Sequence, residues 1–373
     1  MDRLSSLPDK ILHHLLSFLP TKTSVSTSIL SKRWHSLWLH VPALDFDSRD
    51  YLPHSRPSMG SFITGAFLLR GAQTTNMFHL HCNRDGFDVV SYDIDMWVSA
   101  VTRLGVRNLD LHLHHNLLLP HSLFTCKTLV QLTLKCCRVG AGVGRATCNL
   151  PCLKKLHLES VEYQVKEALL SPLAPACPVL EELTVVDCFF FLDDDYDISS
   201  PTIKRLALGF RFKRREFHIS KTMVRINAPA LTYLEVYDCL YERLLFSPPP
   251  SLVKARVHIR YRSAGVLKFL HSLCCNVECL ELQFVDSDSS KLLMEPNQVS
   301  KCLLSSNLTS IEIHQFGCTK GELEQVWYLL SNAKCLKRME IYCSKTEPQV
   351  KSDALNIISS FHRVSQVCQL LLH

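Results

Sequence analysis

The amino-acid sequence predicts an α/β solenoid of mixed α+β content. A module of three short helices comes first, and an irregular horseshoe of repeats sharing one parallel β-sheet follows. Three observations support this fold class. The first 45 residues hold three short helical patterns in succession. From residue 106 onward, an apolar-x-x-apolar-x-apolar pattern recurs. Hydrophobic residues make up 47% of the 373 residues, which indicates a folded chain with a large core.

Prolines bound the first predicted helix. Pro8 suits the first turn of a helix, where a missing N–H costs nothing, and Pro20 stops the run. Between them, apolar residues follow at helical spacing: Ile11, Leu12, Leu15, Leu16 and Leu19. Thr21 or Thr23 can cap a second helix, and Ser31 can cap a third. These two helices carry the remaining large apolar residues: Val25, Ile29, Leu30, Trp34, Leu37 and Trp38.

The module has more large apolar groups than so small a bundle can bury. A unit of about 40 residues rarely stabilises itself without a staple or a partner. We therefore expect one apolar face, including Leu4, Leu7 and Pro8, to dock onto another protein. The alternative is an N-terminal cap of the solenoid that has no partner.

Residues 4–44 resemble the F-box in its plant form. The residues that carry this resemblance are Leu7-Pro8-Asp9, the helix from Ile11 to Pro20, the segment Thr23–Ser31, and Ser31-Lys32-Arg33-Trp34 with Trp38. The resemblance implies binding to a Skp-type adaptor, and through it to a cullin ubiquitin ligase. The residues expected to form the adaptor face or to support it are Leu4, Leu7, Pro8, Ile11, Leu12, Leu15, Leu16, Leu30, Trp34 and Trp38.

Composition limits the compartment and the kinds of partner. The net charge of +6 is small for a dedicated nucleic-acid binder. No apolar signal segment and no apolar run of about 20 residues occurs, so we expect neither secretion nor a membrane partner. The 17 cysteines are then expected to be free thiols in the cytoplasm or the nucleus.

The chain divides into four predicted segments. Residues 1–45 form the F-box, 46–60 a polar linker, 61–295 the repeats and 296–373 a C-terminal module. Residues 61–70 and 93–104 have helical spacing, and residues 77–82 alternate as a strand does.

The repeat is most regular around a central apolar residue. These residues are Leu109, Leu132, Leu156, Leu183, Leu206, Leu234, Ala255, Leu280, Ile311 and Met339, roughly 21 to 31 residues apart, as in leucine-rich repeats. Each short strand buries one face only when units stack in parallel. Cys137, Cys188 and Cys239 follow the central residue by five positions, where leucine-rich repeats take Asn or Cys, so we expect them in the core.

The C-terminal segment resembles the FBD module of plant F-box proteins. The resemblance lies in Gln298–Leu303, Leu308–Ile313, Phe316-Gly317, Glu322–Leu330 and Asn332–Met339, with a last strand over Cys368–Leu372. It departs at the start, where Glu295-Pro296 replaces the usual Trp-Pro lead. Since a solenoid needs its open end covered, this segment is expected to supply that cap.

No set of residues indicates catalysis. His112 and His114 alternate with leucines and are expected on the sheet surface, and Cys136-Cys137 and Cys274-Cys275 lack the paired spacing of zinc knuckles. With only 12 glycines, a phosphate-binding loop is not expected. The sequence therefore predicts neither an enzyme nor a metal site.

Three clusters each have two interpretations. The basic run Arg211, Lys213, Arg214 and Arg215 suits an acidic target segment, a small-molecule ligand or a polyphosphate such as an inositol phosphate, but a solvated loop is favoured. The acidic run Asp193–Asp195 with Asp197 has the same two interpretations, a binding site or a solvated loop, and the solvated loop is favoured. Phe189–Phe191 cannot all face one core, and a contact of Phe190 with a partner is the alternative to burial.

Two functions remain. The first is a non-catalytic substrate-recognition subunit of an SCF-type cullin ubiquitin ligase, whose repeats hold an unknown target protein. The second is a leucine-rich-repeat scaffold or small-ligand sensor outside any ligase. The second is favoured if Leu7, Pro8 and Trp34 are buried within the chain itself.

Overall fold

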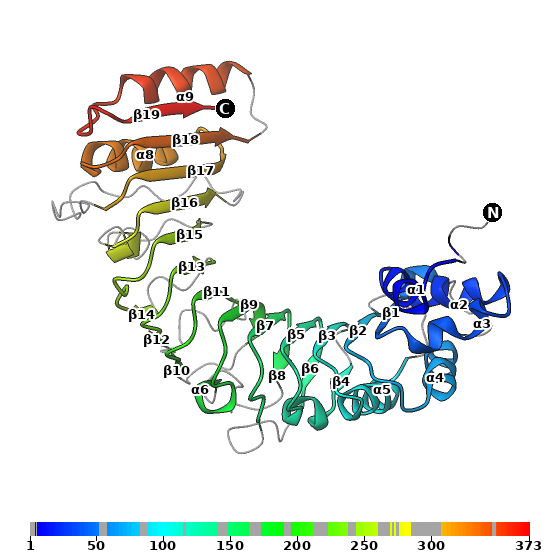
Figure 1. The fold of residues 1–373 in the computed structure, drawn as a ribbon. Coiled ribbons are helices and arrows are strands. Elements are labelled where there is room, and N and C mark those ends of the chain that lie inside the picture. The colour runs from blue at the N-terminus through cyan, green and yellow to red at the C-terminus, as the bar shows by residue number, and fades with distance from the viewer. Residues whose placement is uncertain are drawn as a thin grey trace. The chain divides into compact units, whose positions relative to one another are not determined.

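The computed structural model divides the chain into two compact units, Met1–Phe191 and Leu192–His373 (Figure 1). It describes the residues 4, 6–51, 58–82, 89–114, 117–140, 148–163, 173–189, 195–211, 223–237, 244–259, 269–270, 272–273, 276–284, 307–344 and 348–373. Within these ranges, no helix combines the length and the apolar character that crossing a bilayer requires.

Three short helices form the N-terminal module, as the sequence predicts. They are α1 (Asp9–Leu16), α2 (Thr21–Ser26) and α3 (Trp34–Leu37), with 3-10 turns at Thr27–Ile29 and Trp38–His40. Pro8 and Pro20 immediately precede α1 and α2, where no backbone donor is needed. The expected caps are wrong: Pro20 and Arg33 occupy the N-cap positions of α2 and α3, in place of the threonines and Ser31.

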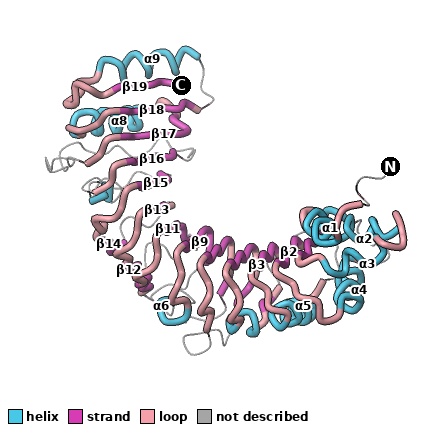
Figure 2. Tube along the Cα trace, viewed as in Figure 1, coloured by secondary structure: helices cyan, strands magenta, loops and turns pink. Residues whose placement is uncertain are grey.

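The first unit continues as a parallel sheet with the strand order β1-β2-β3-β5-β7-β9 (Figure 1). Figure 2 shows its strands in magenta, with loops in pink between them. The strands are β1 (Ala43–Asp47), β2 (Met77–His81), β3 (Asn108–His112), β5 (Gln131–Lys135), β7 (Lys155–Glu159) and β9 (Glu182–Phe189). Shorter strands β4 (Leu118–Leu119), β6 (Arg138–Val139) and β8 (Glu162–Tyr163) pair beside them. The helices between strands are α4 (Met59–Arg70), α5 (Ser91–Arg103) and α6 (Leu173–Ala176).

The second unit repeats this arrangement. Its parallel sheet runs β11 (Arg205–Arg211), β13 (Tyr233–Val236), β15 (Lys254–Ile259), β16 (Cys279–Phe284), β17 (Ser310–Phe316), β18 (Arg338–Cys343) and β19 (Gln369–Leu372). A second sheet holds β10 (Tyr196–Ser199), β12 (Val224–Asn227) and β14 (Leu244–Phe246). Helices α8 (Lys320–Asn332) and α9 (Pro348–Ser360) precede β18 and β19.

The predicted repeat is confirmed in both units. All ten central apolar residues are at most 1% exposed. In the first unit Leu109, Leu132 and Leu156 stand in register on neighbouring strands, and Leu183 continues the row. Each repeat thus adds one buried apolar residue to a continuous core, as stacked repeats require.

A left-handed residue at or near the end of several strands turns the chain into the core. Cys136, Ser160, Asp187 and Gln315 have φ between 52° and 55°, and each lies four residues after a central residue. The residue that follows is fully buried in every case: Cys137, Val161, Cys188 and Phe316. This confirms the core positions predicted for Cys137 and Cys188, whereas Cys239 lies outside the described residues.

The sheet begins earlier than the sequence analysis placed it. Residues 43–47 form β1, so part of the expected 46–60 linker is strand, and β2 continues the same sheet. Leu44 and Phe46 of β1 are 1% exposed and supply its apolar face. Asp45 and Asp47, which flank Phe46, made this stretch look like a linker. The helix α9 was not anticipated either.

Candidate protein-docking sites

The N-terminal module has a small core of its own. The buried residues of this core are Leu12, Leu16, Trp34, Leu37 and Val41. Trp38 is buried as well, and Leu7 packs against the core from its rim. Of the ten expected docking residues, Leu12, Leu16, Trp34 and Trp38 therefore hold the module together and do not face solvent.

A second set of apolar side chains in this module faces solvent. These residues are Leu4, Pro8, Ile11, Leu15, Phe18, Leu19, Ile29 and Leu30. Ile11, Leu15 and Phe18 are spaced by four and three residues, so they share one face of α1 and the turn after it. Their exposed fractions are 46%, 42% and 71%. We call these three residues the α1 stripe.

Three members of the exposed set were not named as docking residues from the sequence. Phe18 and Leu19 lie just before Pro20, and the spacing of Phe18 from Leu15 was a signal for the shared face. Ile29 was assigned to the apolar side of the second helix. The structure ends that helix at Ser26, and the 3-10 turn that follows leaves Ile29 89% exposed.

An arginine ties the start of α1 to the start of α3. Arg33 Nε donates to Asp9 Oδ1 at 3.0 Å, and the same guanidinium donates to the backbone carbonyl of Leu7. The Arg33 and Asp9 side chains are 38% and 59% exposed, so the pair contributes little stability. Its effect is to hold the Leu7-Pro8 turn in one position.

The module is joined to the first repeat by polar contacts. The Thr21 hydroxyl accepts from the backbone N–H of Asp45 at 2.8 Å. Arg70, 4% exposed, donates to the carbonyl of Trp38 at 3.1 Å. Burial lowers the pKa of Arg70 to about 10. The module and the first strands therefore form one body within the first unit.

The solvent side of the first unit's sheet carries paired charges. We call this side the first sheet face; it consists of the solvent-facing side chains of β1, β2, β3, β5, β7 and β9. The pairs are His79–Asp45 at 2.5 Å, His81–Asp47 at 3.3 Å, Lys135–Glu159 at 2.7 Å and Lys155–Glu182 at 3.0 Å. The hydrogen bond with Asp45 raises the pKa of His79.

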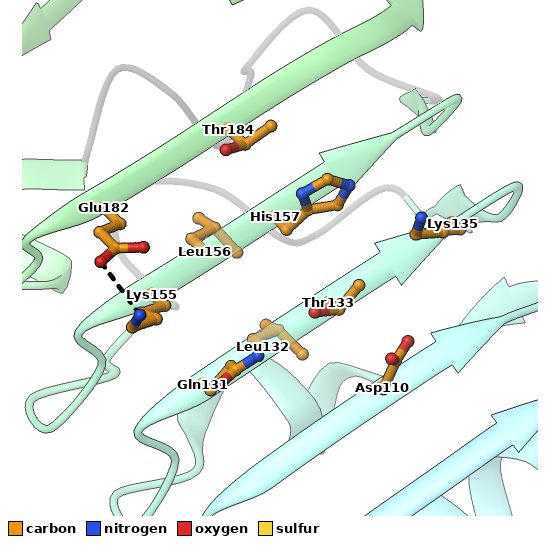
Figure 3. Close-up of a pocket in the computed structure, with 10 residues that line it drawn as sticks. All are labelled: Asp110, Gln131, Leu132, Thr133, Lys135, Lys155, Leu156, His157, Glu182 and Thr184. Carbon is orange, nitrogen blue, oxygen red and sulfur yellow. Dashed lines mark ion pairs between the residues drawn. The ribbon is translucent and has the colours of Figure 1, made fainter. Parts of the chain in front are cut away.

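A pocket of about 360 Å³ opens on the first sheet face (Figure 3). Its lining comes from four neighbouring strands: Asp110, Gln131, Leu132, Thr133, Lys135, Lys155, Leu156, His157, Glu182 and Thr184. The leucines belong to the buried layer, so the accessible side chains are polar. Such a pocket suits a charged or hydrogen-bonding side chain better than an apolar one.

The solvent side of the second unit's sheet is built around Glu235. His258 Nε2 lies 2.7 Å from this carboxylate, and the Tyr233 hydroxyl donates to it at 2.9 Å. Burial would raise the pKa of Glu235, but hydrogen bonds from His258, Tyr233 and Tyr237 lower it to about 2. Tyr237 stacks on the His258 ring at 3.9 Å. This surface is a rigid hydrogen-bonded network.

Among the described residues, one group has the spacing of metal ligands. Ligand atoms of Cys279, Glu281 and Glu312 lie within 4.8 Å of one another. Lys254 and Arg256 already bind the Glu281 carboxylate. Because these cationic groups compete with a metal for that carboxylate, we assign no metal to this group.

The other clusters singled out in the sequence fall largely outside the described residues. Arg211 ends β11, but Lys213, Arg214 and Arg215 are not among the described residues, nor are Phe190, Phe191, Asp193 and Asp194. Asp195 is described: it accepts from the backbone N–H of Met223 at 3.0 Å and pairs with Arg225 at 3.4 Å. Asp197 was expected in a loop, but it is an exposed residue of the strand β10.

Family models match three parts of the chain. The F-box domain model matches residues 4–44, and the FBD model matches residues 295–341. Between them, the model described as "FBD-associated F-box protein At5g56370, LRR repeats" matches residues 94–288. The three matches follow the order expected from the sequence.

Proteins of Arabidopsis thaliana are similar over most or all of the chain. The F-box/LRR-repeat protein At4g14103 is 37% identical over 69% of this chain and 68% of its own length. The FBD-associated F-box protein At5g56560 is 31% identical over 99% of this chain and 98% of its own. The F-box/FBD/LRR-repeat protein At4g00315 is 30% identical over the full length of both. The chain therefore belongs to the F-box/FBD/LRR-repeat family.

Proposed function

We propose that this chain is the substrate-recognition subunit of an SCF-type cullin ubiquitin ligase. The observation that carries the proposal is the exposed apolar set of the N-terminal module. This module keeps its own core, yet leaves eight apolar side chains in solvent within residues 4–30: Leu4, Pro8, Ile11, Leu15, Phe18, Leu19, Ile29 and Leu30. Concentrated exposed apolar residues mark a protein-binding surface.

The partner of this surface is a Skp-type adaptor, and through it a cullin. The match to the F-box domain model at residues 4–44 supports this choice. Leu4, Pro8, Ile11, Leu15 and Leu30 are the expected contacts, Leu7 lies at their edge, and Leu12, Leu16, Trp34 and Trp38 support them from below. The exposure of Pro8 favours docking, whereas the burial of Trp34 is explained by its place in the core.

The repeats bind the target protein and do no chemistry of their own. The ubiquitin-conjugating enzyme sits elsewhere in the complex, and the subunit raises the rate of transfer by holding the target close to it. The family matches support the proposed division into F-box 1–45, linker 46–60, repeats 61–295 and FBD-like segment 296–373. All described cysteines are free thiols, which suits the reducing cytoplasm or nucleus.

Co-purification with a plant Skp-type adaptor and a cullin tests this proposal. The three proteins are expected to elute as one complex with equal stoichiometry. That complex should attach ubiquitin to bound proteins when the conjugating enzymes are added. A chain that elutes alone and ignores the adaptor would contradict the proposal and favour a scaffold or small-ligand sensor.

A further inference from the structure

The pocket on the first sheet face owes its depth to short side chains between longer ones. Asp110, Thr133, His157 and Thr184 occupy equivalent positions on β3, β5, β7 and β9. The two threonines have the shortest side chains in this row, and Asp110 lies at one end of it, on β3 (Figure 3). The volume of about 360 Å³ is at the small end for ligand pockets, and it fits one long side chain.

Charge is not balanced on this face. Its strands carry five solvent-facing carboxylates and two lysines: Asp45, Asp47, Asp110, Glu159 and Glu182 against Lys135 and Lys155. The difference, two minus five, is three negative charges when histidines are neutral, and Arg49, just after β1, offsets one of them through its ion pair with Asp47. Each lysine is matched by a glutamate, so neither leaves free positive charge over the pocket.

Among the five carboxylates, Asp110 is the one that takes part in none of the ion pairs of this face. Asp45 is bonded to His79, and Asp47 is bonded to both His81 and Arg49. Within the described residues, the Asp110 carboxylate makes no ion pair or hydrogen bond, although it is half-buried in the pocket wall. A half-buried carboxylate without a cation is stabilised by a ligand that brings one.

We propose that this pocket binds an arginine side chain from an extended segment of the target protein. The inference rests on the proposed function, because it names the chemistry of the target. A planar guanidinium can pair with Asp110 through two N–H groups and still donate to the Thr133 hydroxyl. The charge left on the face attracts a cationic segment.

Small arginine analogues test the site in the full-length chain without knowledge of the target. The probes are N-acetyl-arginine amide, its citrulline counterpart with the same shape but no charge, and N-acetyl-glutamate amide. Titration followed by ligand-observed NMR should show saturable binding of the arginine probe. The citrulline probe should bind at least about tenfold more weakly, and salt should weaken arginine binding.

Variants assign the binding to the pocket. Asp110→Asn is expected to weaken arginine binding by about tenfold or more. Asp95→Asn on α5 makes the same charge change at an exposed site and should bind as the unaltered chain does. Thr133→Leu fills the hollow and should block binding, provided that its Tm shows a folded protein.

Besides the absence of any arginine binding, two results would overturn the inference. One is undiminished arginine binding by Asp110→Asn. The other is a glutamate probe that binds at least as well as the arginine probe, which would assign the pocket to Lys135 and Lys155. Adaptor binding is measured on the same samples. A chain that binds the adaptor but not arginine loses only this inference, whereas one that binds arginine but not the adaptor contradicts the proposed function.

Discussion

The guanidinium of Arg70 donates a hydrogen bond to the backbone carbonyl of Trp38 at 3.1 Å. Arg70 ends α4 of the first repeat, and Trp38 lies in the last turn of the N-terminal module. Both residues are less than 7% exposed. This buried bond joins the candidate adaptor-binding module to the sheet that carries the pocket.

Removing this arginine should destabilise the first unit. Arg70→Ala leaves the Trp38 carbonyl without its donor and opens a cavity, which should lower the free energy of unfolding by about 2–4 kcal/mol. Arg103→Ala, on the exposed side of α5, should change it by less than about 0.5 kcal/mol. Urea unfolding followed by circular dichroism measures both. Equal effects of the two variants would show that the Arg70 contact contributes nothing.

Acid should destabilise the second unit through Glu235. Its pKa in the folded protein is about 2, against 4.5 for the ordinary side chain. A depressed pKa stabilises the fold above about pH 4.5, and this stability is lost as the pH falls toward 2. The loss is at most about 3 kcal/mol, since solvent screens part of it.

Glu235→Gln should therefore flatten the pH dependence of unfolding between pH 4.5 and 2. Thermal unfolding at half-unit pH steps measures this dependence. Glu324→Gln, an exposed position on α8, provides the matched control and should leave the profile unchanged. If Glu235→Gln leaves the pH dependence of unfolding unchanged, the hydrogen bonds of Glu235 with His258 and Tyr233 are not its cause.

The cysteines that turn into the core should resist alkylation. Burial raises the pKa of the Cys188 thiol to about 12 and raises that of Cys137 as well, so little reactive thiolate forms at pH 8. Cys152 is exposed. Mass spectrometry after brief iodoacetamide treatment should find Cys152 modified in the native protein. Modification of Cys137 and Cys188 should require unfolding, and rapid native labelling of either would contradict their burial.

The left-handed turn after β7 should favour glycine. Ser160 has φ of 53°, a conformation that costs side chains other than glycine about 1 kcal/mol. Ser160→Gly should therefore raise the free energy of unfolding by a few tenths to 1 kcal/mol, and the β-branched Ser160→Val should lower it by about 1–2 kcal/mol. Chemical unfolding compares the two. A Ser160→Val variant more stable than the unaltered protein would show that the positive φ of residue 160 costs no free energy.

The sequence predicted a residue's position only where the pattern around that residue indicates whether it is buried. Central residues such as Leu132 recur at fixed spacing with period-two neighbours, so the strands could be placed without a structure. Leu44 and Phe46 belong to the same pattern, but acidic neighbours hid their strand. The split between Leu12, which is buried, and Ile11, which is exposed, depends on how α1 packs against α3, and apolar spacing alone does not determine it.

The pocket could not be predicted from the sequence, because its lining residues become neighbours only in the folded sheet. Asp110 and Thr133 are 23 positions apart and become neighbours only through the register of β3 and β5. Contiguous runs such as Arg211–Arg215 stand out in a sequence, whereas such scattered residues do not. A pocket on a parallel sheet takes single residues from successive repeats, and nothing in one repeat marks them.

Calorimetric titration with a plant Skp-type adaptor measures whether the α1 stripe binds the adaptor. The test protein is Ile11→Asp with Leu15→Asp. The control is Leu68→Asp with Leu69→Asp, two leucines of α4 that are 78% and 70% exposed outside the module. We expect one-to-one binding by the unaltered chain and by the control. The stripe variant should bind more than about 100-fold more weakly, with an unchanged Tm. If the unaltered chain does not bind, or if the stripe variant binds equally well, the α1 stripe is not the adaptor-binding surface.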